Sequence, residues 1–171
     1  MIKTVLTSAS VLLHFDPALQ TAVHIGARQN AVGEVLLQWQ PGEPHPRPVA
    51  FMSWKLSGAQ YCYDAQNVEA LAAQTALTTW RTIRVGVSLE IYSNHDSLKY
   101  LFTQKASSQR ILRLCEFLAD CDFQEIKYVP GPENVESDFL SRPWDSTLSA
   151  SPILILVTAI PNRQSSLQQL Q

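Results

Sequence analysis

The chain has 171 residues, with 13 lysines and arginines against 15 aspartates and glutamates, and a formal net charge of −2. This length suggests one domain with room for a tail, and a hydrophobic content of 46% is enough for a sizeable core. The near-neutral net charge argues against a protein that binds nucleic acid through overall positive charge alone, but it does not exclude a local basic strip.

Cysteine spacing and hydropathy indicate a reducing, aqueous compartment. The cysteines Cys62, Cys115 and Cys121 form no Cys-x-x-Cys pair, which argues against a zinc site, and their odd number indicates reduced thiols. The longest apolar run, Ile153–Ile160, has about eight residues, whereas a membrane span needs ~20. We therefore expect a soluble intracellular protein of the cytoplasm or nucleus, with no membrane partner.

Apolar runs bounded by turn residues predict three strands early in the chain. Residues 1–16 are expected to form a short helix or turn. Thr21–Ala27 and Asn30–Trp39 are predicted strands joined by a short link, which favours a hairpin. The proline-rich segment 40–48 is a loop, and Val49–Met52 begins the third strand.

The strongest helical signal follows these strands. Asp64–Arg84 is rich in good helix formers and contains neither proline nor glycine. Glu69, Ala73, Ala76 and Trp80 recur at helical spacing, so they are expected to share one face of this helix.

The remaining predicted elements are short and alternate between strand and helix. They are a strand at Ser88–Ser93, helices at His95–Phe102 and Ser107–Cys121, a strand at Phe123–Val129 and a last helix at Glu133–Ser141. This order predicts an α/β fold: a five-stranded mixed sheet, made of a three-strand antiparallel meander plus parallel strands, with helices on its faces.

The end of the chain differs in composition from the rest. Serine, glutamine and the lone apolar run Ile153–Val157 dominate residues 146–171. We expect these residues to form a tail outside the main fold, either loosely ordered or contributing a strand that docks on a neighbour.

Four segments carry motifs in a fixed order. They are PVAFMSWKLS at Pro48–Ser57, YDAQNVEALA at Tyr63–Ala72, YSNHDSLKYL at Tyr92–Leu101 and YVPGPENVESDFLSR at Tyr128–Arg142. Together they resemble the ribonuclease H-like domain of the reverse transcriptase in gypsy-type LTR retrotransposons. The resemblance implies an RNase H-like domain at residues 21–145. It also makes residues 1–20 similar to the linker that joins the polymerase to this domain in a Pol polyprotein.

The resemblance implies Mg²⁺-dependent endonucleolytic hydrolysis of the RNA strand in an RNA–DNA hybrid, with four carboxylates holding two ions. Two of the four catalytic positions keep their carboxylates, Glu69 and Asp138, which would be the metal ligands. The other two are degenerate: Gly26 offers no ligand, and Asn94 offers only a neutral carbonyl oxygen. We therefore expect a degraded metal site, doubtful Mg²⁺ binding and no hydrolytic activity.

Plainer interpretations of single residues stay open. Glu69 is also a favourable charge near a helix start, Asp138 a solvated helix residue and His95 a structural hydrogen-bonding residue. Two other functions also remain. One is a noncatalytic nucleic-acid or protein binding module on the same fold. The other is a live enzyme in which Asp96 or Glu34 supplies a missing carboxylate.

Basic and aromatic residues mark a candidate nucleic-acid surface. The candidate contacts are Arg28, Lys99, Tyr100, Lys105 and Arg142. An ordinary solvated surface is the alternative, so weak and salt-sensitive binding of an RNA–DNA hybrid is the most that the sequence supports. The other implied partners are further parts of a Pol polyprotein.

Overall fold

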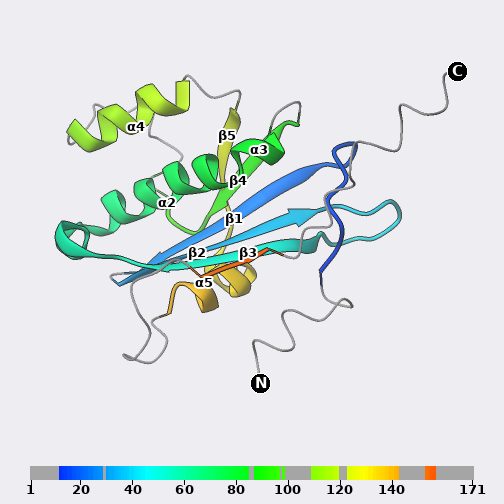
Figure 1. Ribbon diagram of the computed structural model, residues 1–171, viewed down its shortest axis with the longest axis horizontal. Helices are drawn as coiled ribbons and strands as arrows, with labels where there is room; N and C mark the ends of the chain where they lie inside the picture. Colours follow the sequence, from blue (N-terminus) through cyan, green and yellow to red (C-terminus); the bar gives the residue numbers. More distant parts are fainter. Residues whose placement is uncertain are drawn as a thin grey trace, which may run out of the picture.

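The structure is a computed structural model, which describes residues 12–28, 30–84, 87–96, 98, 109–119, 123–142 and 153–156 (Figure 1). The strands are β1 (Thr21–Arg28), β2 (Ala31–Gln38), β3 (Arg47–Lys55), β4 (Leu89–Ser93), β5 (Phe123–Tyr128) and β6 (Ile153–Leu156). The α-helices are α2 (Ala65–Thr79), α3 (Arg81–Arg84), α4 (Gln109–Ala119) and α5 (Val135–Leu140). Two 3₁₀ turns, η1 (Gly58–Cys62) and η3 (Gly131–Glu133), complete the list of described elements.

The strands form one mixed sheet in the order β5-β4-β1-β2-β3-β6. β1, β2 and β3 form an antiparallel meander, and β1, β4 and β5 run parallel. Short connections allow antiparallel neighbours, whereas the parallel pair β1–β4 requires a crossover, which α2 and α3 supply. This arrangement confirms the predicted five-stranded α/β fold, to which β6 adds a sixth strand.

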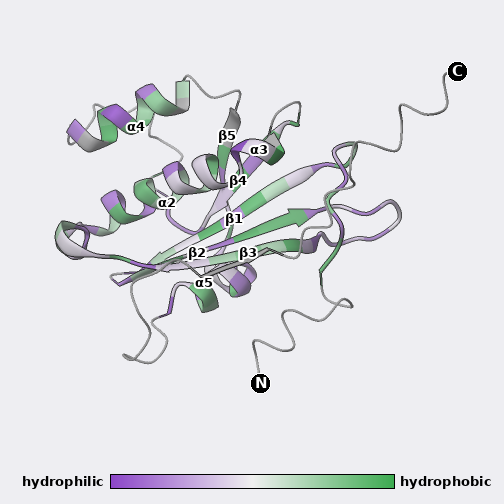
Figure 2. Ribbon diagram, viewed as in Figure 1, coloured by the Kyte–Doolittle hydropathy of each residue, from purple (hydrophilic) through white to green (hydrophobic). Residues whose placement is uncertain are grey.

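Helices cover both faces of the sheet: α2 and α4 lie on one side and α5 on the other (Figure 1). β2 is buried along its whole length. Figure 2 shows stretches of hydrophobic residues in the central strands of the sheet. Alternation along β2 separates two cores. Val32 and Leu36 pack into the larger core with α2, whereas Val35 and Leu37 pack into a smaller one with Leu140 of α5.

The long predicted helix is present but interrupted. α2 begins after Asp64, whose side chain accepts a 2.8 Å hydrogen bond from the Asn67 backbone N–H, as an N-cap should. The helix ends at Trp80, which separates α2 from the single turn α3. The four residues predicted to share a face, Glu69 and Trp80 among them, are all buried, so the periodicity argument is confirmed.

Two details differ from the sequence-based expectation. The first is that residues 12–16 lie in neither helix nor strand. The second is that the last helix begins at Val135 rather than Glu133, because Glu133 ends the separate 3₁₀ turn η3 and Asn134 lies between the two elements. Most of the predicted helix His95–Phe102 lies outside the described residues and stays a prediction. None of the helices in the described part of the chain combines the length and apolar character that crossing a bilayer requires.

Four residues of the segment predicted to be a tail join the sheet of their own chain. β6 pairs antiparallel with β3, from Ser53 opposite Ile153 to Ala50 opposite Leu156. The physical reason is that β3 would otherwise be an edge strand with unpaired backbone groups, and the uncharged sequence of β6 suits a strand.

Candidate active site

Parallel pairing brings the four positions of the expected metal site together. Ile25 of β1 lies opposite Ser93 of β4, so Gly26 and Asn94 are the next residues along two parallel neighbours. The carboxyl ends of parallel strands meet at one edge of a sheet. α2 brings Glu69 to this edge from one face, and α5 brings Asp138 from the other.

Glu69 is a buried carboxyl group, only 3% exposed. Its Oε1 accepts a hydrogen bond from the Ala27 backbone N–H at 3.3 Å, and its Oε2 accepts one from the Ser93 hydroxyl at 3.2 Å. Ser93 Oγ in turn accepts from the His95 backbone N–H at 3.0 Å. Burial raises the pKa of Glu69 to about 7, and the two hydrogen bonds to its oxygens oppose that rise. A large fraction of Glu69 is therefore protonated near neutral pH.

Asp138 is held by two guanidinium groups. Arg28 donates to Asp138 Oδ1 from Nη2 at 2.8 Å and from Nε at 3.1 Å, and Arg142 Nη2 donates to Oδ2 at 2.7 Å. The hydrogen bond from Arg142 lowers the pKa of Asp138, and Arg28 lowers it further. Both oxygens of the retained carboxylate are therefore already bound to cations of the chain itself.

Two glycines let α5 lie directly on the sheet. Gly26 and Gly33 face each other in the β1–β2 register, beneath Ser137. A Cβ added to Gly26 would lie 2.9 Å from the carbonyl carbon of Ser137, and one added to Gly33 would lie 2.5 Å from its oxygen. Buried Asn134 fixes the start of α5 by donating to the Ile25 carbonyl at 2.8 Å and accepting from the Ser137 hydroxyl.

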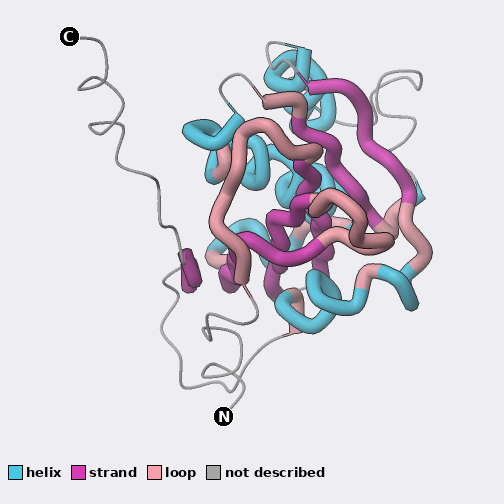
Figure 3. Tube along the Cα trace, turned by 90° about the vertical axis from the view of Figure 1, so that its right-hand side faces the viewer, coloured by secondary structure: helices cyan, strands magenta, loops and turns pink. Residues whose placement is uncertain are grey.

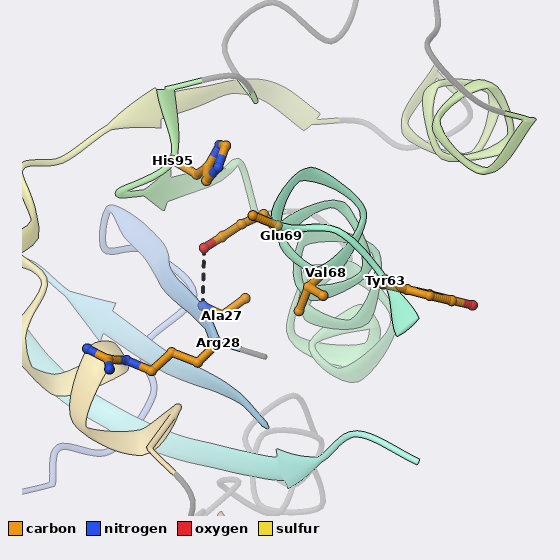
Figure 4. A pocket seen from close by; sticks show the side chains of 7 residues that line it. Ala27, Arg28, Tyr63, Val68, Glu69 and His95 are labelled. Atoms are coloured by element: carbon orange, nitrogen blue, oxygen red, sulfur yellow. Dashed lines mark hydrogen bonds between the residues drawn. The ribbon is translucent and has the colours of Figure 1, made fainter. Parts of the chain in front are cut away.

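A pocket of about 310 Å³ opens beside Glu69 (Figure 4). It is lined by Ala27, Arg28, Tyr63, Ala65, Val68, Glu69 and His95. In Figure 4 the Glu69 side chain points toward the Ala27 backbone, while the Arg28 side chain turns toward α5. The two retained carboxylates are therefore engaged with different partners rather than directed at a shared point.

The residues at this edge do not fit a centre of two Mg²⁺ ions. Such a centre needs several ionised oxygen ligands directed at a common point. Here Gly26 supplies no donor, Asn94 is uncharged, burial favours the protonated form of Glu69, and Asp138 is paired with Arg28 and Arg142. Metal binding would require deprotonating one group and breaking the ion pairs of the other.

The candidate nucleic-acid contacts fall into two groups. Arg28 and Arg142 are partly exposed, with side-chain exposures of 49% and 59%, but both are paired with Asp138. Lys99, Tyr100 and Lys105 lie outside the described residues.

The two carboxylates considered as replacements are placed differently. Asp96 is exposed, just beyond β4. Glu34 is fully buried in β2, where its Oε2 accepts a 3.1 Å hydrogen bond from the Trp80 indole N–H. Trp80 follows Glu69 by 11 residues, which is about 16 Å along a helix at ~1.5 Å per residue. This anchoring holds Glu34 toward the opposite end of α2 and argues against its joining Glu69 in a site.

Sequence reasoning did not single out Ser93 or Asn134, and it did not pair Arg28 with Asp138. Two of these residues had a local signal: Ser93 directly precedes Asn94, and Arg28 lies two residues beyond Gly26. A positive charge next to a position expected to carry a carboxylate suggests an internal ion pair, but the partner lies 110 residues away in the chain.

Comparison with known proteins identifies a family and solved structures with the same fold. The sequence model of the family described as the RNase H-like domain found in reverse transcriptase matches residues 16–121. The Tf2-3 and Tf2-4 transposon polyproteins of Schizosaccharomyces pombe (strain 972 / ATCC 24843) are each 35% identical to this chain over 150 residues. That match covers 85% of this chain but only 11% of each polyprotein, so the chain spans a small part of these relatives.

Solved structures share the fold at low identity. The native prototype foamy virus protease–reverse transcriptase aligns with a TM-score of 0.63 at 17% identity, covering 78% of this chain and 18% of that one. LC11-RNase H1 in complex with an RNA/DNA hybrid aligns with a TM-score of 0.53 at 14% identity, covering 71% and 92%. The family match, together with this fold, shows that the chain belongs to the RNase H-like domains found in reverse transcriptases.

Proposed function

We propose that this chain is the RNase H-like domain of a gypsy-type retrotransposon reverse transcriptase and that it does not hydrolyse RNA. The observation that carries the proposal is the pair of short contacts from Arg28 to Asp138, at 2.8 and 3.1 Å. The Arg28 guanidinium is hydrogen-bonded to the Asp138 carboxylate, which by the family resemblance would bind a metal ion.

Charge explains why this arrangement opposes metal-dependent hydrolysis. Two Mg²⁺ ions bring four positive charges to one site, and ionised ligands must offset their mutual repulsion. Asp138 is the one carboxylate at the four positions whose pKa is lowered, and two arginines already neutralise it. Glu69, with a pKa near 7, would first have to lose a proton in a buried environment.

A cleavage assay on the full chain tests this proposal. A labelled RNA–DNA hybrid is incubated with the protein in Mg²⁺, in Mn²⁺ and in chelator, beside an active bacterial ribonuclease H as a positive control. We expect no cleavage above the chelator background. Metal-dependent cleavage that disappears in Glu69→Ala would contradict the proposal and would mean that the site has been rebuilt.

A noncatalytic binding module is the second candidate, supported by the pocket beside Arg28. This pocket of about 310 Å³ combines a half-exposed guanidinium with Tyr63 and His95, a mixture suited to contacts with phosphates and bases. We propose an RNA–DNA hybrid, or another part of a Pol polyprotein, as its partner.

The binding test measures fluorescence anisotropy of a labelled hybrid against protein concentration, with and without chelator and at several salt concentrations. Hybrid binding should be weak, insensitive to chelator and weakened by salt. Arg28→Gln should reduce the affinity more than Arg47→Gln, which removes the same charge from β3. Equal effects of the two substitutions would argue against binding at the pocket.

A further inference from the structure

The outer edge of β3 is covered by the chain's own C-terminal strand. β6 pairs antiparallel with β3 at four positions, from Ser53 opposite Ile153 to Ala50 opposite Leu156. Figure 3 shows β6 as the outermost strand, with the other strands all on one side of it. β6 lies beyond residues 16–121, the part that matches the family.

An apolar groove lies beside this edge. It has a volume of about 180 Å³ and is lined by Phe51 of β3 and by Val135, Glu136, Phe139 and Leu140 of α5. Val135 is 60% exposed and Phe139 is 37% exposed, so this groove leaves apolar surface of α5 open to solvent. An uncovered β3 would therefore present unpaired backbone groups next to apolar surface. That combination favours pairing with another chain.

We propose that β6 is an intramolecular cap that occupies the β3 edge and prevents it from pairing with a second copy of the chain. The inference is independent of the proposed function, because it concerns the opposite edge of the sheet from β4 and β5. The occupant is well suited to the site: Ile153–Leu156 is uncharged and rich in residues that favour strands.

The connection between α5 and β6 favours the chain's own strand over a neighbour's. The Ser53 hydroxyl donates a 2.7 Å hydrogen bond to the Leu140 carbonyl at the end of α5, and Ser53 also lies opposite Ile153. Leu140 and Ile153, on either side of residues 143–152, therefore both lie at Ser53 of β3. A short tether of this kind gives an effective concentration on the order of millimolar, so at micromolar protein the chain's own β6 outcompetes that of a second copy.

Proline substitution in β6 tests the cap in the full chain. Ile155→Pro removes a backbone N–H and disfavours strand pairing, while Ser165→Pro places the same residue outside the cap as a matched control. Hydrogen exchange of residues 47–55 and the mass in solution by light scattering are then measured at 10 to 200 µM protein. We expect Ile155→Pro to exchange several-fold faster in this segment and to double in mass with rising concentration. The control and the wild type should stay protected and monomeric.

A second variant and a peptide exclude a general folding defect. Replacing Ile153–Leu156 with Gly-Ser-Gly-Ser should reproduce the effect of Ile155→Pro without introducing proline. A synthetic peptide of residues 150–158, added in excess, should restore both protection and the monomeric mass. Unchanged exchange in both variants, or fast exchange with a mass that stays monomeric at every concentration, would overturn the proposal.

Discussion

The guanidinium of Arg28 in β1 lies against the carboxylate of Asp138 in α5, with Nη2 2.8 Å and Nε 3.1 Å from the same oxygen. Arg28 follows the glycine at one degenerate position, and Asp138 is one of the two retained carboxylates. The chain thus ties α5 to β1 with its own cation at the place where the resemblance implies metal ions.

This pairing predicts a measurable coupling between the two residues. Arg28→Gln and Asp138→Asn should each lower the free energy of unfolding by about 1 kcal/mol, because the pair is only partly buried. The loss should be larger for Asp138→Asn, which also releases Arg142. A double-mutant cycle from urea denaturation should give a coupling energy of about 1 kcal/mol. Fully additive losses would show that the contact contributes nothing to stability.

Introducing an aspartate should lower the stability of the fold at position 26 but change it little at position 94. Gly26→Asp forces a Cβ to within 2.9 Å of the Ser137 backbone, so it should destabilise the fold by about 1–3 kcal/mol. Gly26→Ala should cause a similar loss, since the clash begins at Cβ. Asn94→Asp is half-buried at the strand end and should change stability by less than about 1 kcal/mol.

The double variant Gly26→Asp/Asn94→Asp should consequently gain little Mg²⁺ affinity, as measured by calorimetry, because Arg28 still holds Asp138. Tight binding of Mg²⁺ by this variant would show that α5 moves away from β1 easily.

The raised pKa values of the buried acids Glu34 and Glu69 make a contribution to folding stability that falls as pH rises. Burial raises the pKa of Glu34 to about 8 and that of Glu69 to about 7, against an ordinary value of 4.5. Between pH 4.5 and 8 the folded state therefore holds protons that the unfolded state has released. The contribution of these two acids to the free energy of unfolding should therefore decrease across this window and level off above it.

Glu34→Gln isolates the larger of these contributions. The amide can still accept the hydrogen bond from Trp80 but cannot ionise. Urea denaturation between pH 5 and 9 should show a flatter profile for this variant and a clear gain over the wild type at pH 8. Glu43→Gln, an exposed site, serves as the control. A profile as steep as that of the wild type would mean that Glu34 ionises in the folded protein at its ordinary pKa.

Ser93 should tune the ionisation of Glu69. Its hydroxyl donates to Glu69 Oε2 at 3.2 Å and stabilises the charged form, so Ser93→Ala should raise the pKa of Glu69 above its present value of about 7. Carbon-13 NMR titration of the glutamate carboxyl groups measures this shift. Thr75→Ala, which removes a hydroxyl bonded within α2, should leave the pKa of Glu69 unchanged. An unaltered pKa in Ser93→Ala would exclude a significant hydrogen bond.

Local patterns predicted most of the fold because they act over a few residues. The apolar runs bounded by turn residues predicted β1 and β2, and the helical spacing from Glu69 to Trp80 follows directly from helix geometry. The prediction of which face of α2 is buried is confirmed for the same reason. Helix ends were less accurate: the interruption at Trp80 coincides with its contact to Glu34, a residue 46 positions earlier in the chain.

The sequence by itself, through its resemblance to the family, predicted that Gly26 and Asn94 stand where two carboxylates are expected. The tertiary structure alone decided what the remaining groups do. Arg28 meets Asp138 across 110 residues, α5 approaches β1 because two glycines lie opposite each other, and β6 reaches β3 after a long separation in sequence. Such contacts depend on which strands become neighbours in the sheet, and a local sequence pattern does not show which distant segments lie close together in space.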